Sequence, residues 1–128
     1  MERQRVSSGS PFEPTIGFSR AMRVGPHVFV SGTAPVWPDG SCDADPAVQA
    51  RRCLEIILAA LAEAGASAAD VVRTRTYLVD IADAGPVSNV QREAFGAVRP
   101  ASTMLAVAAL LDPRWKVEIE AEALIGAG

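Results

Sequence analysis

The chain has 128 residues, a length that fits one domain. Hydrophobic residues make up 49% and charged residues 21%, so the composition supports a packed core and excludes a disordered chain. The formal net charge is −3 and aromatic residues are only 5%. Both values argue against a nucleic-acid partner, because a surface that binds nucleic acid needs an excess of cations and aromatic side chains on which bases stack. We expect a single domain over residues 1–128.

Cysteine and histidine are too scarce for a structural zinc site. The chain has two cysteines, Cys42 and Cys53, and one histidine, His27, whereas such a site needs about four of these ligands. The sequence does not exclude a site in which carboxylates bind a hard cation. The N-terminal residues do not follow the pattern of a secretory signal, and no stretch approaches the roughly 18 apolar residues of a membrane span. We therefore expect a cytoplasmic protein that does not associate with a membrane.

The first third of the chain predicts a β-hairpin between loops. Residues 1–15 are expected to be loop and short strand, with Gly9–Pro14 as a loop. Residues 16–24 and 27–32 then read as two strands joined by the turn residues Gly25 and Pro26. Residues 33–45 contain several Pro and Gly residues and predict an irregular surface loop.

A helix is predicted from Pro46 to the residue before Gly65. Asp45 is a typical N-cap residue, and proline is favoured at the first helical position. One apolar stripe follows the helical spacing and consists of Leu54, Ile57, Leu58 and Leu61. Gly65 is typical of the position after a helix end.

The remaining pattern predicts three strands and one more helix. Ser67 to Asp70 resembles a capping box. After it we expect a strand over 71–80, a helix over 83–95, and strands over 103–111 and 117–125. The result is an α+β sheet with two helices on one face. Residues 104–111 are apolar at both odd and even positions, so both faces of this strand should be buried. Because the two helices cover only one face, we expect a second copy of the protein to cover the other.

Two groups of charged residues are candidates for chemistry. Glu118, Glu120 and Glu122 lie on one face of the last strand. They form either a solvated face or, for one of them, a general base in a cleft between subunits. The arginines are either structural or, for one of them, the holder of a substrate carboxylate, because guanidinium binds carboxylates in a bidentate manner.

Several short segments are informative when they are taken together. In chain order they are residues 16–25, 28–32, 63–67, 70–74, 79–80, 89, 99–103 and 117–121. Together these segments resemble the RidA family, also called YjgF/YER057c/UK114. Each segment is short and unspecific alone, whereas their order over roughly residues 16–123 is specific.

The resemblance implies both a fold and an activity. The fold is chorismate-mutase-like, with a six-stranded sheet, two helices on one face, and a homotrimer with clefts between subunits. The activity is hydrolysis of reactive enamine or imine intermediates to a keto compound and ammonia, without a metal or organic cofactor. In this family an arginine grips the substrate carboxylate, and a glutamate on the last strand positions the attacking water.

The resemblance also assigns site residues in this chain. Glu118 matches the water-positioning glutamate and is the expected catalytic residue. The expected substrate-binding residues are Phe18, Arg20, Ser31, Gly32, Asn89, Ser102 and Thr103. Two of them depart from the family pattern, because Ser102 stands in place of the arginine and Phe18 in place of a tyrosine.

The change to Ser102 removes the cation that would bind a carboxylate, and three explanations stay open. Arg20, which shares a strand face with Phe18, replaces the lost charge; Arg99 or Arg92 replaces it; or the substrate has no carboxylate and bonds to Ser102 and Thr103. Of these we expect Arg20.

Four functions are consistent with this pattern. The leading hypothesis is an enamine/imine deaminase with altered substrate preference. The alternatives are a non-catalytic small-molecule-binding or regulatory trimer, a scaffold repurposed for a biosynthetic intermediate, and RNA cleavage, which is ascribed to some relatives. The net charge of −3 weighs against RNA cleavage.

Overall fold

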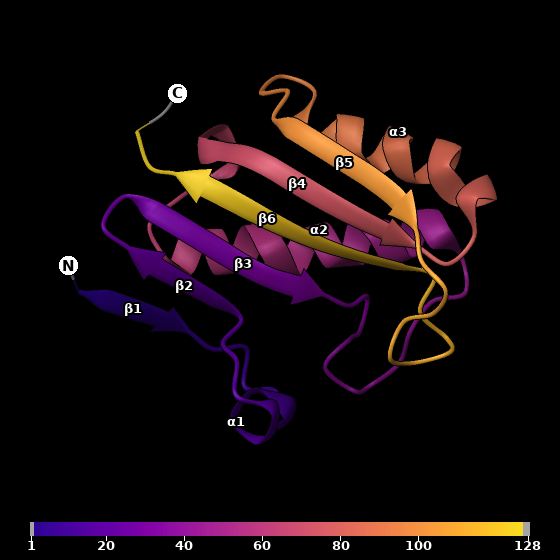
Figure 1. Cartoon of the computed structure of the whole chain (residues 1–128), viewed down its shortest axis with the longest axis horizontal. Coiled ribbons are helices and arrows are strands. Elements are labelled where there is room, and N and C mark those ends of the chain that lie inside the picture. The colour runs from indigo at the N-terminus through magenta and orange to yellow at the C-terminus, as the bar shows by residue number, and fades with distance from the viewer. Residues whose placement is uncertain (1, 127–128) are drawn as a thin grey trace.

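The computed structural model describes residues 2–126, which form one mixed sheet and a layer of helices (Figure 1). The strands are β1 (Arg3–Val6), β2 (Ala21–Val24), β3 (His27–Thr33), β4 (Val71–Leu78), β5 (Ala101–Ala106) and β6 (Val117–Leu124). The α-helices are α1 (Phe12–Ile16), α2 (Pro46–Glu63) and α3 (Ala84–Phe95). Two 3-10 turns, η1 (Ala68–Asp70) and η2 (Ile81–Asp83), precede β4 and α3.

The last strand of the chain lies in the middle of the sheet. The strand order is β1-β2-β3-β6-β4-β5. β6 is antiparallel to both of its neighbours, β3 and β4, and only β4 and β5 pair in parallel. The glutamates of β6 therefore lie between side chains contributed by distant parts of the sequence.

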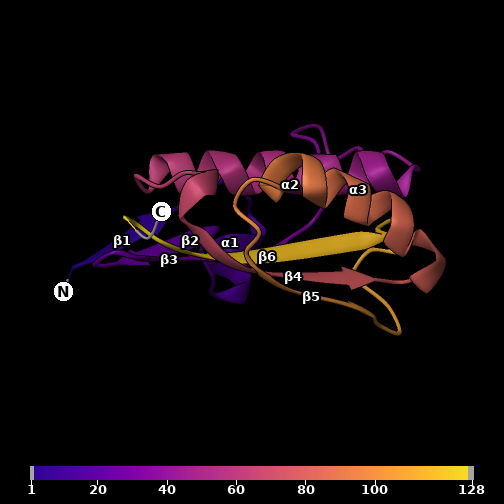
Figure 2. The same ribbon diagram turned by 90° about the horizontal axis from the view of Figure 1, so that it is seen from above.

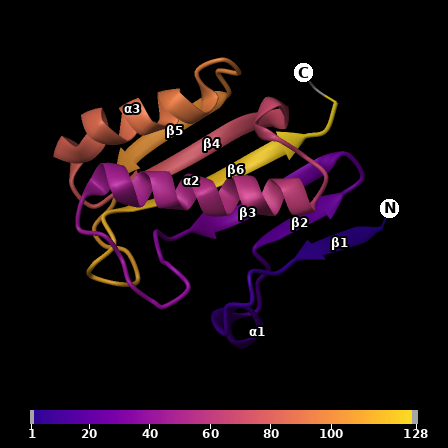
Figure 3. The same cartoon turned by 180° about the vertical axis from the view of Figure 1, so that it is seen from behind.

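Helices α2 and α3 lie on the same side of the sheet, and neither of them reaches the opposite face (Figures 2 and 3). Along β6, the residues that face the helices are buried: Val117, Ile119, Ala121 and Ala123. They pack with the buried stripe of α2, which includes Leu54, Ile57 and Leu61. The structure confirms the predicted layering, and it places the glutamates of β6 on the opposite face, which we call the open face.

The predicted boundaries of α2 are confirmed. The Asp45 side chain accepts hydrogen bonds from the backbone N–H groups of Ala47 (2.8 Å) and Val48 (3.2 Å), as an N-cap should. Gly65 follows the helix with a φ of +88°, a conformation that glycine adopts without strain. The capping box from Ser67 to Asp70 is also present, although it caps the short turn η1.

The prediction for residues 9–24 is partly wrong. Residues 12–16 form the short helix α1 instead of a loop and the start of a strand, and β2 begins only at Ala21. The backbone carbonyl of Glu13 accepts hydrogen bonds from the N–H groups of Gly17 and Phe18, both at 2.9 Å, and Gly17 has a φ of +95°. This helix end reverses the chain before β2.

The prediction of one strand over residues 103–111 is also wrong at its end. β5 stops at Ala106, because its only partner in the sheet, β4, ends at Leu78, the residue paired with Ala106. Residues 107–116 form a loop instead. The apolar run is therefore not one two-sided strand, although Leu105 of β5 is still 39% exposed on the open face.

Within residues 2–126, no helix is both long enough and apolar enough to cross a membrane.

Candidate functional site

A β-bulge at the end of β3 shapes the candidate site. Val30 pairs with Ala121 and Thr33 with Ile119, so Ser31 and Gly32 together face one residue of β6. The Ser31 hydroxyl donates to the Ser19 carbonyl (2.6 Å), and the Thr33 hydroxyl donates to the Ser31 carbonyl (2.8 Å). Such bulges re-aim side chains next to active sites.

The carboxylate of Glu118 packs directly against Gly32. A Cβ atom added at Gly32 would lie 2.7 Å from Glu118 Oε2, closer than real contacts allow. Glycine leaves this space to the Glu118 carboxylate, and any side chain at position 32 would displace the carboxylate from it.

Arg20 reaches the same place from the segment before β2. Its Nη2 donates to the Gly32 carbonyl at 2.5 Å, and its guanidinium lies 5.8 Å from the centre of the Phe18 ring. The Arg20 Nε is buried and has no hydrogen-bond partner among the described residues. The structure thus brings together five predicted site residues, which we call the Gly32 corner: Phe18, Arg20, Ser31, Gly32 and Glu118.

The three glutamates of β6 are not equivalent. Tyr77 Oη donates to Glu120 Oε1, and Arg75 Nη1 lies 3.0 Å from Glu122 Oε1. The side chain of Glu118, by contrast, has no hydrogen bond and no ion pair with any residue in the described part of the chain. Glu118 is therefore the carboxylate that is free to act on a bound molecule.

The surroundings of Glu118 favour its protonated form. Burial raises the pKa of Glu118 above its ordinary value; Arg20 opposes this rise and Glu120 adds to it. Burial likewise lowers the pKa of Arg20, against the attraction of Glu13 and Glu118. A carboxyl group with a raised pKa exchanges protons with a substrate more readily near neutral pH.

Ser102 and Asn89 lie away from the Gly32 corner. The Ser102 hydroxyl is 2.9 Å from Gln91 Nε2, and Asn89 Oδ1 accepts from Arg92 Nη2 at 3.1 Å. A pocket of about 400 Å³ lies between α3 and β5, lined by Ser88, Gln91, Arg92, Phe95, Gly96, Arg99, Pro100, Ser102 and Met104. Within one chain, Ser102 and Asn89 thus form a second group, separate from the Gly32 corner.

Thr103 belongs to neither group. It pairs with Arg75 on β4 and lies on the open face, two strands from Glu118. Arg92 and Arg99 line the pocket that contains Ser102, whereas Arg20 lies beside Glu118. Arg20 is therefore the only one of the three candidate arginines in the Gly32 corner.

Two residues near the corner were not singled out for a role by the sequence. Glu13 is 4% exposed although it lies in a segment that reads as a loop, and Tyr77 is opposite Glu118 in the β4–β6 register. The alternation in the sequence places Tyr77 on one strand face with Arg73 and Arg75. It does not predict the bond between Tyr77 and Glu120. No group of three metal-binding side chains occurs in the part of the chain that the structure describes.

Comparison with known proteins identifies the family. The family model described as Endoribonuclease L-PSP matches residues 9–125. The chain belongs to this family, known as YjgF/YER057c/UK114 or RidA. The predicted family is thereby confirmed.

Relatives and solved structures agree over nearly the whole chain. The crystal structure of Rv2704 from Mycobacterium tuberculosis, a member of the same family, is 47% identical with a TM-score of 0.90; the match covers 97% of this chain and all of that one. The protein SCO2049 of Streptomyces coelicolor is 38% identical over 97% of this chain and 93% of its own. The predicted α+β fold class is confirmed by these similarities.

A further relative has a name that refers to an activity. TdcF of Escherichia coli, whose name describes a reactive intermediate deaminase, is 33% identical over 84% of this chain and 85% of its own. The crystal structure of TdcF with bound serine has a TM-score of 0.79 and is 29% identical, with 94% of this chain and 92% of that one covered.

Proposed function

We propose that this protein hydrolyses reactive enamine or imine intermediates to a keto compound and ammonia. One observation carries the proposal: Glu118 is a half-buried carboxylate that packs on Gly32 and is bonded to no other described residue. Family membership and the similarity to TdcF support the choice of reaction.

In the proposed reaction Glu118 moves protons to and from one water molecule. The water oxygen bonds to the imine carbon and the carbon–nitrogen double bond becomes single, while Glu118 accepts a proton from the water and passes it to the imine nitrogen. Glu118 then assists transfer of the hydroxyl proton to the nitrogen; the carbon–nitrogen bond breaks, ammonia leaves and the carbonyl forms. General acid–base catalysis of this kind contributes typically about 10²- to 10⁴-fold to a rate.

Arg20 is proposed to hold an acidic group of the substrate. Ser102 cannot supply the cation that the resemblance assigns to its position, and Arg20 is the cation beside Glu118. Because Arg20 lies in the segment before β2 whereas residue 102 lies on β5, the acidic group would bind in a different direction. We therefore expect an altered substrate preference.

The complete site is proposed to form between copies of the chain. Asn89, Ser102 and Thr103 lie away from the Gly32 corner of their own chain, so a second copy would have to bring them to it. We propose the homotrimer that the family resemblance implies. We further propose that the protein is cytoplasmic, that it needs no cofactor and that it has no nucleic-acid partner.

The test uses an imine generated enzymatically from an amino acid, with ammonia release as the measurement. The purified protein should accelerate the release over buffer, and Glu118→Gln should lower the rate by about 10²-fold or more. Glu63→Gln, at an exposed position of α2, is the matched control and should keep full activity. Arg20→Gln should raise the KM for substrates that carry a carboxylate.

Two results would contradict the proposal. The first is a lack of acceleration with several amino-acid-derived imines; ligand binding without consumption would then favour the binding or regulatory trimer. The second is full activity of Glu118→Gln. A gain in activity in Ser102→Arg would show that the change at this position removed only the carboxylate-binding cation.

A further inference from the structure

The pocket between α3 and β5 contains two arginines for which the proposed function has no role. Its volume is about 400 Å³, and Arg92 and Arg99 lie in its wall together with Ser102. Among the described residues, no aspartate or glutamate lines it. Glu93, the one acidic residue of α3, forms an ion pair with Arg51 of α2 at 3.3 Å. The wall of the pocket thus carries positive charge.

The polar groups of this wall supply free hydrogen-bond donors. Arg92 Nη2 donates to Asn89 Oδ1 at 3.1 Å, a neutral acceptor that holds the guanidinium without cancelling its charge. Ser102 Oγ accepts from Gln91 Nε2 at 2.9 Å, and its own O–H has no acceptor among the described residues. The Arg99 guanidinium has no hydrogen bond or ion pair with any residue that the structure describes. Free donors beside two cations bind an oxyanion, because its oxygens only accept.

Arg99 has a backbone conformation that is unfavourable for an arginine. Its φ is +54°, and over residues 2–126 it is the only residue other than glycine with a positive φ. The turn after α3 imposes this conformation, since the N–H groups of Val98 and Arg99 both donate to the Phe95 carbonyl, at 3.0 and 2.7 Å. Glycine adopts this φ without strain, whereas the Cβ of arginine is crowded there. Strain of this kind is typical of positions where a binding site needs the side chain.

We propose that the pocket binds an acidic group of the substrate through Arg92 and Arg99, a second group besides the one held by Arg20. The inference rests on the proposed function, in which a second copy of the chain brings Ser102, and with it this pocket, to the Gly32 corner. A substrate bound there meets Arg20 at one end and the two other arginines at the opposite end. The preferred substrates are therefore imines derived from amino acids with an acidic side chain, such as aspartate and glutamate.

The first experiment measures binding without turnover. Succinate has two carboxylates and the carbon skeleton of aspartate, whereas propionate has one carboxylate and the skeleton of alanine. Backbone amide signals in NMR report on each end, Gly32 for the corner and Gly96 for the pocket. Succinate should shift both signals and propionate chiefly that of Gly32. Succinate should also bind about tenfold more tightly, because it gains charge-assisted hydrogen bonds in the pocket.

Arg99→Gly is the decisive variant. Because glycine suits a φ of +54°, the melting temperature should rise, while the affinity for succinate should fall about tenfold, to that of propionate. Arg92→Gln should weaken succinate binding in the same way, and Arg20→Gln should weaken the binding of both probes. Arg3→Gln, at an exposed position of β1, is the matched control and should change neither affinity.

Three results would overturn the inference. The first is equal affinity of the wild type for the two probes. The second is succinate binding that survives both Arg99→Gly and Arg92→Gln; with a lower melting temperature in Arg99→Gly, the arginine would serve the turn alone. The third is inorganic phosphate that shifts the Gly96 signal at lower concentration than succinate does, which would assign the pocket to a separate anion.

Turnover tests the proposed function separately. The KM for an imine derived from aspartate or glutamate should be about tenfold lower than that for an alanine-derived imine, and Arg99→Gly should remove the difference. An active enzyme without this preference would overturn the inference and leave the proposed function intact. A protein that binds succinate through Arg92 and Arg99 but hydrolyses no imine would end the proposed function and still support the pocket as the site of the second acidic group.

Discussion

Gly32 has no side chain, and the space this leaves is occupied by the Glu118 carboxylate. In Gly32→Ala the new Cβ would lie 2.7 Å from Oε2, so the carboxylate must move. Because the displaced atom is the end of a flexible side chain, we expect the melting temperature to change little. The rate of imine hydrolysis should fall by about tenfold or more, since small displacements of a catalytic group are costly.

The matched control is Gly85→Ala on α3, where an added Cβ would meet nothing within 4 Å. This variant should keep full activity. If Gly32→Ala were as active as Gly85→Ala, the contact between Gly32 and Glu118 would not matter for catalysis.

Glu118 is also expected to make stability depend on pH. Its folded-state pKa lies above the ordinary value of 4.5, chiefly because of burial. The folded state therefore binds the proton more tightly than the unfolded state does, and this contribution is lost as pH rises from 4.5 through the folded pKa. Glu118→Gln should melt at a higher temperature than the wild type at pH 7, and the difference should vanish below pH 4.5. A lower melting temperature at pH 7 would contradict the raised pKa.

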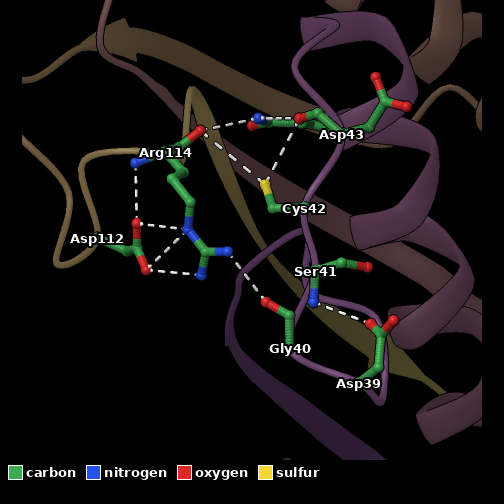
Figure 4. A network of polar contacts seen from close by, with 8 residues as sticks. Asp39, Gly40, Ser41, Cys42, Asp43, Asp112 and Arg114 are labelled. Atoms are coloured by element: carbon green, nitrogen blue, oxygen red, sulfur yellow. Dashed lines mark hydrogen bonds and ion pairs between the residues drawn. The ribbon is translucent and has the colours of Figure 1, made fainter.

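At the scale of elements, Gln49 fastens helix α2 to two loops. Its Nε2 donates to the carbonyls of Asp43 (2.6 Å) and Arg114 (2.9 Å), and its Oε1 accepts from the Lys116 N–H (2.7 Å). The same loops meet again where Arg114 Nη1 donates to the Gly40 carbonyl at 3.1 Å (Figure 4). Because Lys116 directly precedes β6, this junction fixes the start of the strand that carries Glu118.

We expect Gln49→Ala to lower the free energy of unfolding by about 3 kcal/mol, because three part-buried hydrogen bonds of about 1 kcal/mol each are lost. Gln4→Ala is the control: Gln4 makes one exposed hydrogen bond, to the Glu63 carbonyl, so the change should stay below about 0.5 kcal/mol. Chemical denaturation measures both. A loss below about 1 kcal/mol in Gln49→Ala would show that the loops are held by other contacts.

At the scale of the whole molecule, the open face is polar in its centre and apolar at several exposed positions. Phe29 on β3 is 47% exposed and Leu105 on β5 is 39% exposed, and both share the open face with the glutamates of β6. Exposed apolar side chains on an uncovered sheet face are typical of an interface. They agree with the proposed homotrimer.

The proposed homotrimer predicts a mass by light scattering of three times that of one chain. Leu105→Arg should reduce it to the mass of a single chain while the circular dichroism stays native, because a charge would be buried without a partner. Ala59→Arg, on the exposed side of α2, should leave the mass unchanged. A wild-type protein with the mass of one chain would contradict the trimer and the shared site.

The sequence by itself determined the features that depend on neighbours along the chain. The cap at Asp45, the end at Gly65 and the alternation of β6 were all predicted and are present. They follow from backbone geometry within a few residues, which is why a local pattern is sufficient. The family resemblance was likewise carried by short segments in a fixed order.

Only the tertiary structure decided which glutamate of β6 is free. Tyr77 and Arg75, the partners of Glu120 and Glu122, lie more than 40 positions earlier in the chain and meet them only through the β4–β6 register. The end of β5 and the meeting of Arg20 with Glu118 at Gly32 depend in the same way on segments distant in sequence. Alternation along a strand assigns a side chain to a face, but the partner across the sheet is set by strand pairing, which no local pattern encodes.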